Sequence, residues 1–187
     1  YDIQTRPILK LLIIFFNFFP IWIRSVIKIL WMILFYPFLF LTYLYGSNLS
    51  KLHKIPKNYG IEVDVRDYKN QLILNHDPFK DGESFESLLK NYEHGTLIIN
   101  VKSEFIELRI IRLLNKYKVK KYFFLDSSYP VMIKFNKYNN KNFAIRVSDY
   151  ESVKNIYKFK NTFKWIWLEI FKKVELSKKD LIFIKKK

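Results

Sequence analysis

The sequence predicts an α/β fold, specifically an incomplete (β/α) barrel of the TIM type. Seven short runs rich in Ile, Val, Leu and Phe follow one another after residue 46, and most gaps between them have helical periodicity. Apolar strands that alternate with amphipathic helices are typical of parallel strands covered by helices. The chain has only 4 glycines, and no glycine-rich loop follows a strand, which disfavours a nucleotide-binding open sheet. Seven strands in about 125 residues approach a barrel that lacks roughly one unit.

The strands are expected in the order in which the apolar runs occur. The runs are residues 61–65, 72–76, 96–102, 121–126, 143–148, 165–169 and 181–185. Only a short turn separates the first two runs, so we expect these two strands to form a hairpin. Every other connection is long enough for a helix.

Helices are expected in three of the gaps. Residues 83–92 place Phe85, Leu88, Leu89 and Tyr92 on one face, and residues 104–116 place Phe105, Leu108, Ile111 and Leu114 on one face. Asp149 follows a strand and precedes a helical pattern, where it suits a helix cap. These helices would cover the strands.

The N-terminal part has a different composition and predicts a membrane-associating segment over residues 1–46, before a barrel domain over 47–187. Residues 29–45 carry no charge, and their 17 positions are the lower limit for a helix that spans a bilayer. Residues 11–23 are shorter and contain Asn17 and Pro20, so an interfacial or re-entrant segment is expected there. A buried hydrophobic hairpin, or a stretch that is not natural coding sequence, is the alternative. The first residue is Tyr, so we expect a fragment or a processed product.

The net charge limits the classes of molecule that this chain is expected to bind. Lys and Arg number 33 against 17 acidic residues, which gives +16. Such a charge suits anionic lipid, a phosphorylated substrate or nucleic acid. The basic clusters lack a nucleic-acid-binding motif, so we expect anionic membrane lipid and no nucleic acid, with the basic domain on the cytoplasmic side of a membrane. The absence of cysteine excludes disulfides, thiolate catalysis and Cys-ligated zinc.

Functional groups of a barrel cluster at the carboxyl ends of its strands. Glu62 and Asp64 alternate in phase on the first strand and share one face. Two inward carboxylates persist mainly where a cation neutralises them, and oxygen ligands suit Mg²⁺ or Ca²⁺. The alternative is an edge strand with this face in water.

Later strand ends supply further candidates. His76 ends the second strand and suits general acid–base work. Lys102 ends the third strand in phase with Asn100 and suits a phosphate oxyanion, and Arg146 is a second anion contact. Asp126 and Glu169 also end strands, where rim salt bridges are equally expected. His53 and His94 receive no role.

The stretch GIEVDVRDYKNQLILNHDPF resembles the core of the glycerophosphodiester phosphodiesterase family, which is related to the phosphatidylinositol-specific phospholipases C. The resemblance implies a (β/α) barrel in which Glu62 and Asp64 bind Ca²⁺ or Mg²⁺ and His76 is the acid–base catalyst. The downstream sequence, from HGTLIINVKSE through YFFLD and RVSDYES to WIWLE, resembles more closely an uncharacterised bacterial branch of that superfamily, associated with surface-polysaccharide gene clusters. The resemblance covers roughly residues 48–170.

Two positions depart from the family pattern. The His-Arg pair that normally ends the first strand is absent, and Asn100 stands where the third metal ligand is usually Glu. Lys102 fits the pattern. The resemblance therefore implies a metal-dependent phosphodiesterase that acts on a glycerophosphodiester or on a lipid- or glycan-linked phosphodiester. The alternatives are a non-catalytic or truncated barrel that binds phosphorylated glycan or lipid, and a basic protein of the membrane surface.

Overall fold

The computed structural model describes residues 41–44, 49–169, 171–172 and 175–185. Its strands are β1 (Leu41–Leu44), β2 (Gly60–Tyr68), β3 (Gln71–Leu74), β4 (Glu83–Ser84), β5 (Leu97–Val101), β6 (Tyr122–Leu125), β7 (Ala144–Val147) and β8 (Trp165–Leu168). The helices are the 3₁₀ helix η2 (Leu49–Lys54), α3 (Phe85–Lys90), α4 (Glu107–Lys116), α5 (Tyr129–Asn136), α6 (Lys154–Lys158) and α7 (Lys178–Lys185).

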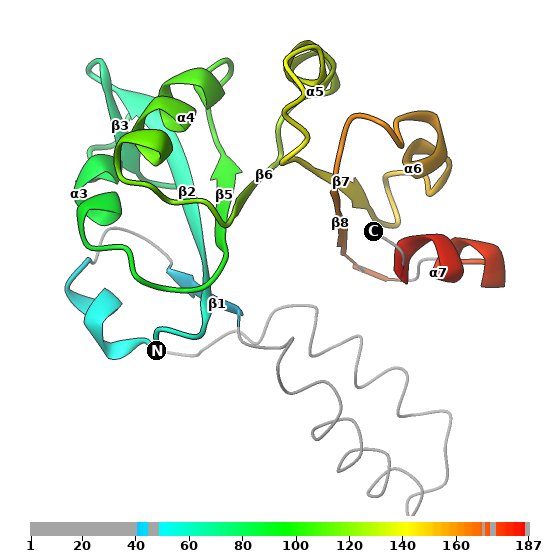
Figure 1. The fold of residues 1–187 in the computed structure, drawn as a ribbon, viewed down its shortest axis with the longest axis horizontal. Helices are drawn as coiled ribbons and strands as arrows, with labels where there is room; N and C mark the ends of the chain where they lie inside the picture. The colour runs from blue at the N-terminus through cyan, green and yellow to red at the C-terminus, as the bar shows by residue number, and fades with distance from the viewer. Residues whose placement is uncertain (1–40, 45–48, 170, 173–174, 186–187) are drawn as a thin grey trace, which may run out of the picture.

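Two sheets organise the described part of the chain. The larger is six-stranded, with the order β4-β3-β2-β5-β6 and β1 beside β2. Strands β1, β2, β5 and β6 run parallel, whereas β3 and β4 run antiparallel to their neighbours. The smaller sheet is the parallel pair β7 and β8. Figure 1 shows α3 and α4 beside the large sheet and α6 and α7 beside the small one.

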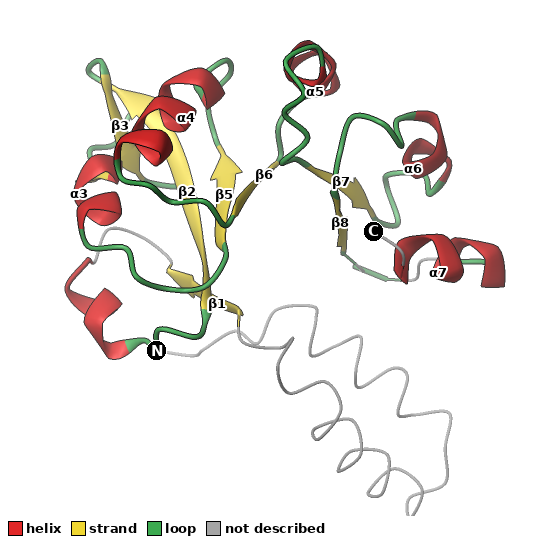
Figure 2. Ribbon diagram, viewed as in Figure 1, coloured by secondary structure: helices red, strands yellow, loops and turns green. Residues whose placement is uncertain are grey.

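The predicted (β/α) barrel is therefore wrong. The described strands form an open mixed sheet and a separate parallel pair, with one isolated bridge between Phe124 and Phe143 linking β6 to the segment before β7. On the other side, β3 and β4 end the sheet as antiparallel strands. Figure 2 shows β7 and β8 on the far side of β6 from β5. Sequence periodicity indicates strands and helices but does not determine whether the sheet closes.

The predicted membrane segment lies mostly outside the described residues, because residues 1–40 are among those not described. Its last part is described, and there the helical prediction is wrong. Leu41–Leu44 form β1 and pair in parallel with Gly60–Val63 of β2. Within the described ranges, no helix combines the length and apolar character needed to cross a bilayer.

The predicted hairpin is confirmed as β2 and β3. Its two turn residues, Lys69 and Asn70, have φ values of 45° and 62°. Two successive left-handed residues are the geometry of a type I′ turn, in which Asn is favoured. Strand β2 continues past its pairing with β5, which ends at Val65, and the hairpin brings the chain back along β2.

The two faces of the strands are packed differently. Ile61, Val63 and Val65 of β2 face the main core, which contains buried residues of α3, α4, α5 and α6. The opposite face carries a smaller apolar cluster of Ile98, Phe123, Leu125 and Ala144, with Trp167 against it. Because side chains alternate along a strand, the polar residues of β2 lie on this second face.

The prediction of a helix over residues 104–116 needs correction. Residues 104–116 do form a helix from Glu107, but Phe105 and Leu108 are 68 % and 49 % exposed, while Ile110 and Leu114 are buried. The helix begins three residues later than predicted, and its buried face is rotated accordingly.

The last predicted strand, residues 181–185, is instead part of α7. Ser177 and Asp180 cap this helix reciprocally, through Ser177 N to Asp180 Oδ2 at 2.8 Å and Asp180 N to Ser177 Oγ at 3.2 Å. This capping box fixes a helical start. Asp149, predicted as a helix cap, accepts hydrogen bonds from the backbone of Phe171 and Lys172 instead.

Candidate functional site

Polar side chains of β2 and β5 meet on one face of the large sheet. Glu62 and Asp64 lie in phase on β2, and Asp64 is in register with Asn100 of the parallel strand β5. The exposed fractions of these three residues are 7 %, 4 % and 6 %. The prediction that both carboxylates share a buried face is confirmed, and the alternative of an edge strand in water is wrong because β2 lies between β1, β3 and β5.

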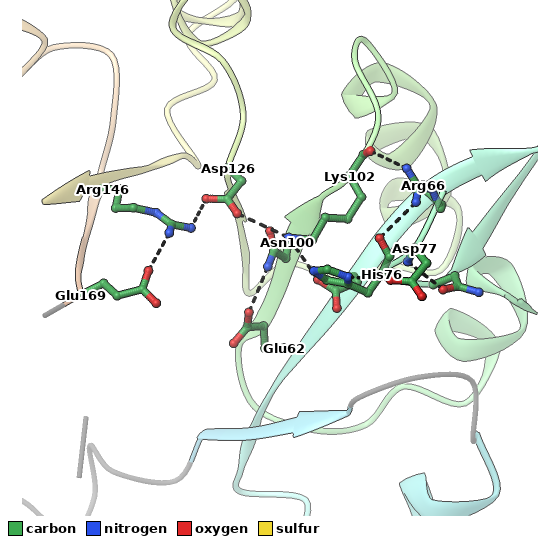
Figure 3. A network of polar contacts seen from close by, with 11 residues as sticks. Glu62, Arg66, His76, Asp77, Asn100, Lys102, Asp126, Arg146 and Glu169 are labelled. Atoms are coloured by element: carbon green, nitrogen blue, oxygen red, sulfur yellow. Dashed lines mark hydrogen bonds and ion pairs between the residues drawn. The ribbon is translucent and has the colours of Figure 1, made fainter. Parts of the chain in front are cut away.

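Asn100 is oriented by Glu62. Its amide nitrogen donates to Glu62 Oε1 at 3.3 Å (Figure 3), and its buried oxygen Oδ1 has no hydrogen-bond partner in the structure. A buried amide oxygen without a donor is costly, and two carboxylates with one amide oxygen form the kind of donor set that Mg²⁺ or Ca²⁺ accepts. The residues present therefore fit a divalent cation. Among the described residues, no group of three or more His, Cys, Asp or Glu could hold a metal ion. A cation on this face would therefore need Asn100 as a donor beside Glu62 and Asp64.

Lys102 links two carboxylates rather than standing alone. Its Nζ lies 3.5 Å from Asp64 Oδ1 and 3.5 Å from Asp126 Oδ2. Leu125 shares the face of Asn100, so regular alternation would turn Asp126 away. Asp126 instead has a left-handed backbone with φ of 62°, which Asp tolerates better than most residues. Its carboxylate thereby meets Lys102.

Arg146 of β7 continues this chain of charges. It donates to Asp126 and, at 2.6 Å, to Glu169 Oε2 beyond the end of β8. Asp126 and Glu169 do form salt bridges, with Arg146, although there is no barrel rim for them to occupy. Figure 3 shows Arg146 between the two carboxylates. The charge of Arg146, predicted as an anion contact, is already compensated by carboxylates. The structure places Arg146 beside the site rather than against the Glu62–Asp64 pair.

His76 reaches the site through the hairpin. Asn75 N donates to Asp64 O at 3.2 Å, so the chain after β3 still runs alongside β2 when it arrives at His76. The imidazole is 48 % exposed, and its Nδ1 lies 3.0 Å from Asp77 Oδ1. Hydrogen bonds from Lys80 and His76 lower the pKa of Asp77 to about 2. An ionised Asp77 only accepts, which assigns the proton to Nδ1 and makes Nε2 the basic nitrogen of the neutral ring.

Sequence reasoning missed two residues of this site. Asp77 follows His76 directly, and the dipeptide itself is the signal for the pair. Arg66 lies in phase with Glu62 and Asp64 on β2 and is 9 % exposed. It was missed because the strand was expected to end at Val65, although the alternation continues through Arg66.

A pocket of about 280 Å³ adjoins the site at the carboxyl ends of β5 and β6. Lys102 and Asp126 line it together with Val101, Ser103, Glu104, Glu107, Ser127 and Ser128. Glu107 begins α4, is 1 % exposed and accepts from Ser127 Oγ at 2.8 Å. Burial raises the pKa of the Glu107 carboxyl.

The change Glu107→Gln should alter the pH dependence of stability. The pKa of Glu107 is raised in the folded state, so wild-type protein loses stability as pH rises from the unfolded pKa, about 4.5, through the folded one. The uncharged variant does not, because it cannot ionise. We expect its free energy of unfolding, relative to wild type, to increase as the pH rises from 4 to 7. Urea unfolding at several pH values measures this difference.

The matched control is Glu104→Gln, which removes an exposed carboxylate from the same pocket. Its unfolding free energy should follow the wild-type pH curve closely, because the charge of Glu104 is the smallest of the causes that raise or lower the pKa of Glu107. A Glu107→Gln curve that also parallels wild type would show that the Glu107 carboxylate is ionised at no cost in the folded protein.

No family model, no curated protein and no solved structure matches this chain. The site is therefore defined by its own geometry.

Proposed function

We propose that this chain is a metal-dependent phosphodiesterase that acts on a glycerophosphodiester or on a lipid- or glycan-linked phosphodiester. The observation that carries the proposal is the meeting of Asp64, His76 and Lys102 at one place on the sheet. Asp64 lies on β2, His76 follows β3 of the same hairpin, and Lys102 follows β5. Lys102 Nζ lies 3.5 Å from Asp64 Oδ1, Asn75 N donates to Asp64 O, and Figure 3 shows His76 and Lys102 in the same polar network. Phosphodiester cleavage needs a group that transfers a proton, oxygen ligands for a metal ion and a positive charge near the phosphate.

Each residue has a defined part in the reaction. Glu62, Asp64 and Asn100 would hold a divalent cation, which supplies charge for the phosphate oxygens when bound. His76 would move a proton at Nε2, since Asp77 holds Nδ1. Lys102 lies 3.5 Å from Asp64 Oδ1 and would donate to a phosphate oxygen while limiting repulsion among the carboxylates. The basic surface and the apolar N-terminal residues favour action on substrates at an anionic membrane.

The change Asp64→Asn tests the cation-binding part. Asp64 is 4 % exposed and lies beside Asn100, so the variant keeps the shape but removes one charge. We expect turnover of bis(4-nitrophenyl) phosphate with Mg²⁺ or Ca²⁺ to fall by about 10²–10³-fold. We also expect weaker Mg²⁺ and Ca²⁺ binding by titration calorimetry. Addition of EDTA to wild-type protein should abolish turnover.

Asp67→Asn is the matched control, because Asp67 lies on the same strand with an exposed side chain. Its turnover and cation affinity should equal those of wild type. Wild-type turnover that persists in EDTA, or an Asp64→Asn variant as active as Asp67→Asn, would refute the metal-dependent reaction.

A second candidate function is the binding of a phosphorylated glycan or lipid without turnover. Turnover is disfavoured by the ion pairs of Lys102 and Arg146, because charges already compensated by Asp64, Asp126 and Glu169 stabilise a developing negative charge less. Asn100 also provides a neutral donor where the resembled family has a carboxylate. Binding of phosphodiesters by a protein that hydrolyses none of them would support this function over the enzyme.

A further inference from the structure

One buried guanidinium joins the two segments that carry His76 and Lys102. Arg66 Nη1 donates to the carbonyl oxygen of His76 at 3.0 Å, and Nη2 donates to the carbonyl oxygen of Lys102 at 2.9 Å. The two accepting residues are 26 positions apart in sequence. Figure 3 shows Arg66 with both bonds, beside His76 and Lys102. The side chain therefore sets the distance between the backbone at the end of the hairpin and the backbone at the end of β5.

Arg66 differs from the other arginine of the region. Within the described ranges it forms no ion pair with a carboxylate, whereas Arg146 contacts Asp126 and Glu169. With 9 % of its surface exposed, it is satisfied by backbone carbonyls. The planar fork of a guanidinium can hold two acceptors at a fixed spacing, which the ammonium of Lys cannot do. Its function is therefore to fix a distance between two backbone segments.

The outer end of the same hairpin is attached by other residues. Arg109 of α4 donates to the carbonyl oxygen of Asn70 at 2.8 Å and lies 4.0 Å from Asp67 Oδ2. Ser103 Oγ accepts from the backbone of Asp67 at 3.3 Å. These contacts hold the hairpin to the β5–α4 segment without touching His76. Arg66, by contrast, hydrogen-bonds to the backbone of both His76 and Lys102.

We infer that Arg66 is a positioning residue of the proposed phosphodiesterase site, which holds the imidazole of His76 and the ammonium of Lys102 at the spacing that the reaction requires. The inference rests on the proposed function for its catalytic consequence. Its structural part, the placement of His76 by Arg66, stands on the two hydrogen bonds. A displacement of about 1 Å between reacting groups can lower a rate by about 10²-fold.

The kinetic test compares Arg66→Ala, Arg66→Lys and Arg109→Ala on bis(4-nitrophenyl) phosphate with Mg²⁺ or Ca²⁺. Both alanine variants remove a guanidinium that anchors the same hairpin, but only Arg66 contacts His76 and Lys102. For Arg66→Ala we expect kcat to fall by about 10²-fold with KM little changed, and free guanidinium to restore part of it. Arg66→Lys should be nearly as slow, while Arg109→Ala should stay close to wild type. Equal losses in Arg66→Ala and Arg109→Ala would overturn the inference.

A spectroscopic test separates this inference from the proposed function. The chain has 3 histidines, so their ring signals can be assigned by single substitution. We expect Arg66→Ala to shift the signals of His76 while those of His53 and His94 stay in place, and Arg109→Ala to shift none of them. Unmoved His76 signals in folded Arg66→Ala would overturn the positioning role. Absence of turnover in wild type, with His76 signals that do shift, would refute the enzyme and leave the placement of His76 by Arg66 established.

Discussion

Phe143→Ala should lower the free energy of unfolding by about 3–5 kcal/mol. Phe143 is fully buried and stacks on Phe124, with ring centroids 5.1 Å apart, and it also contacts Phe135 of α5. It forms the isolated bridge between β6 and the segment before β7. Its removal leaves a cavity where the two sheets meet. Urea unfolding followed by far-ultraviolet circular dichroism measures the loss.

Phe105→Ala is the matched control, since this phenylalanine is 68 % exposed. Its effect should stay within about 0.5 kcal/mol. Similar losses for the two variants would show that the small sheet does not depend on the Phe124–Phe143 contact. A two-step transition in Phe143→Ala would show that β7 and β8 unfold separately once the contact is lost.

His76→Ala should reduce phosphodiester turnover by about 10²–10⁴-fold, the usual contribution of a positioned acid–base group. The imidazole is oriented by Asp77 at 3.0 Å and is partly exposed, so its removal takes away the proton carrier without opening the core. The measurement is kcat on bis(4-nitrophenyl) phosphate at saturating Mg²⁺ or Ca²⁺. Stability should change little.

The control for this variant is His53→Ala, because His53 is exposed on the 3₁₀ helix η2. It should keep full activity. Equal activity of the two variants would exclude His76 from the reaction. Retained phosphodiester binding without turnover in wild type would then favour the non-catalytic function.

The strands were the most predictable part of the fold. Six of the seven expected runs contain a strand of the structure, from β2 at Gly60–Tyr68 to β8 at Trp165–Leu168. Their apolar residues are buried against helices, and the short apolar runs that this burial requires can be recognised in the local sequence. The arrangement of the sheets was not predictable in this way. The single bridge at Phe124 and Phe143 depends on how distant segments pack.

Helix boundaries depended on caps that periodicity does not reveal. The Ser177–Asp180 capping box turns an apolar run that reads as a strand into the helix α7. At α4, a start at Glu107 buries Ile110 and exposes Leu108. The capping box fixes the start of α7, whereas the N-cap of α4, Ile106, makes no side-chain capping hydrogen bond.

The alternation on β2 predicted the buried positions of Glu62 and Asp64, and the register with β5 brought Asn100 beside them. The ion pairs were harder to foresee. Asp126 reaches Lys102 only because of its left-handed backbone, a conformation that no pattern in the sequence indicates. Lys102 and Arg146 were therefore expected to meet a ligand, whereas the structure pairs both with carboxylates.

The two-residue turn at Lys69 and Asn70 also has a consequence for the order of folding. Hairpins with such short loops close within about 1–10 μs, because little chain entropy is lost. His76 can therefore reach Asp64 early, through local pairing alone. Asn100 and Lys102 join the site later, because β3, β4 and α3 lie between β2 and β5 in the chain. The parallel pairing of β2 with β5 must therefore close a longer loop. We therefore expect one half of the site to assemble as a local unit, and the other half to be added when the parallel sheet forms.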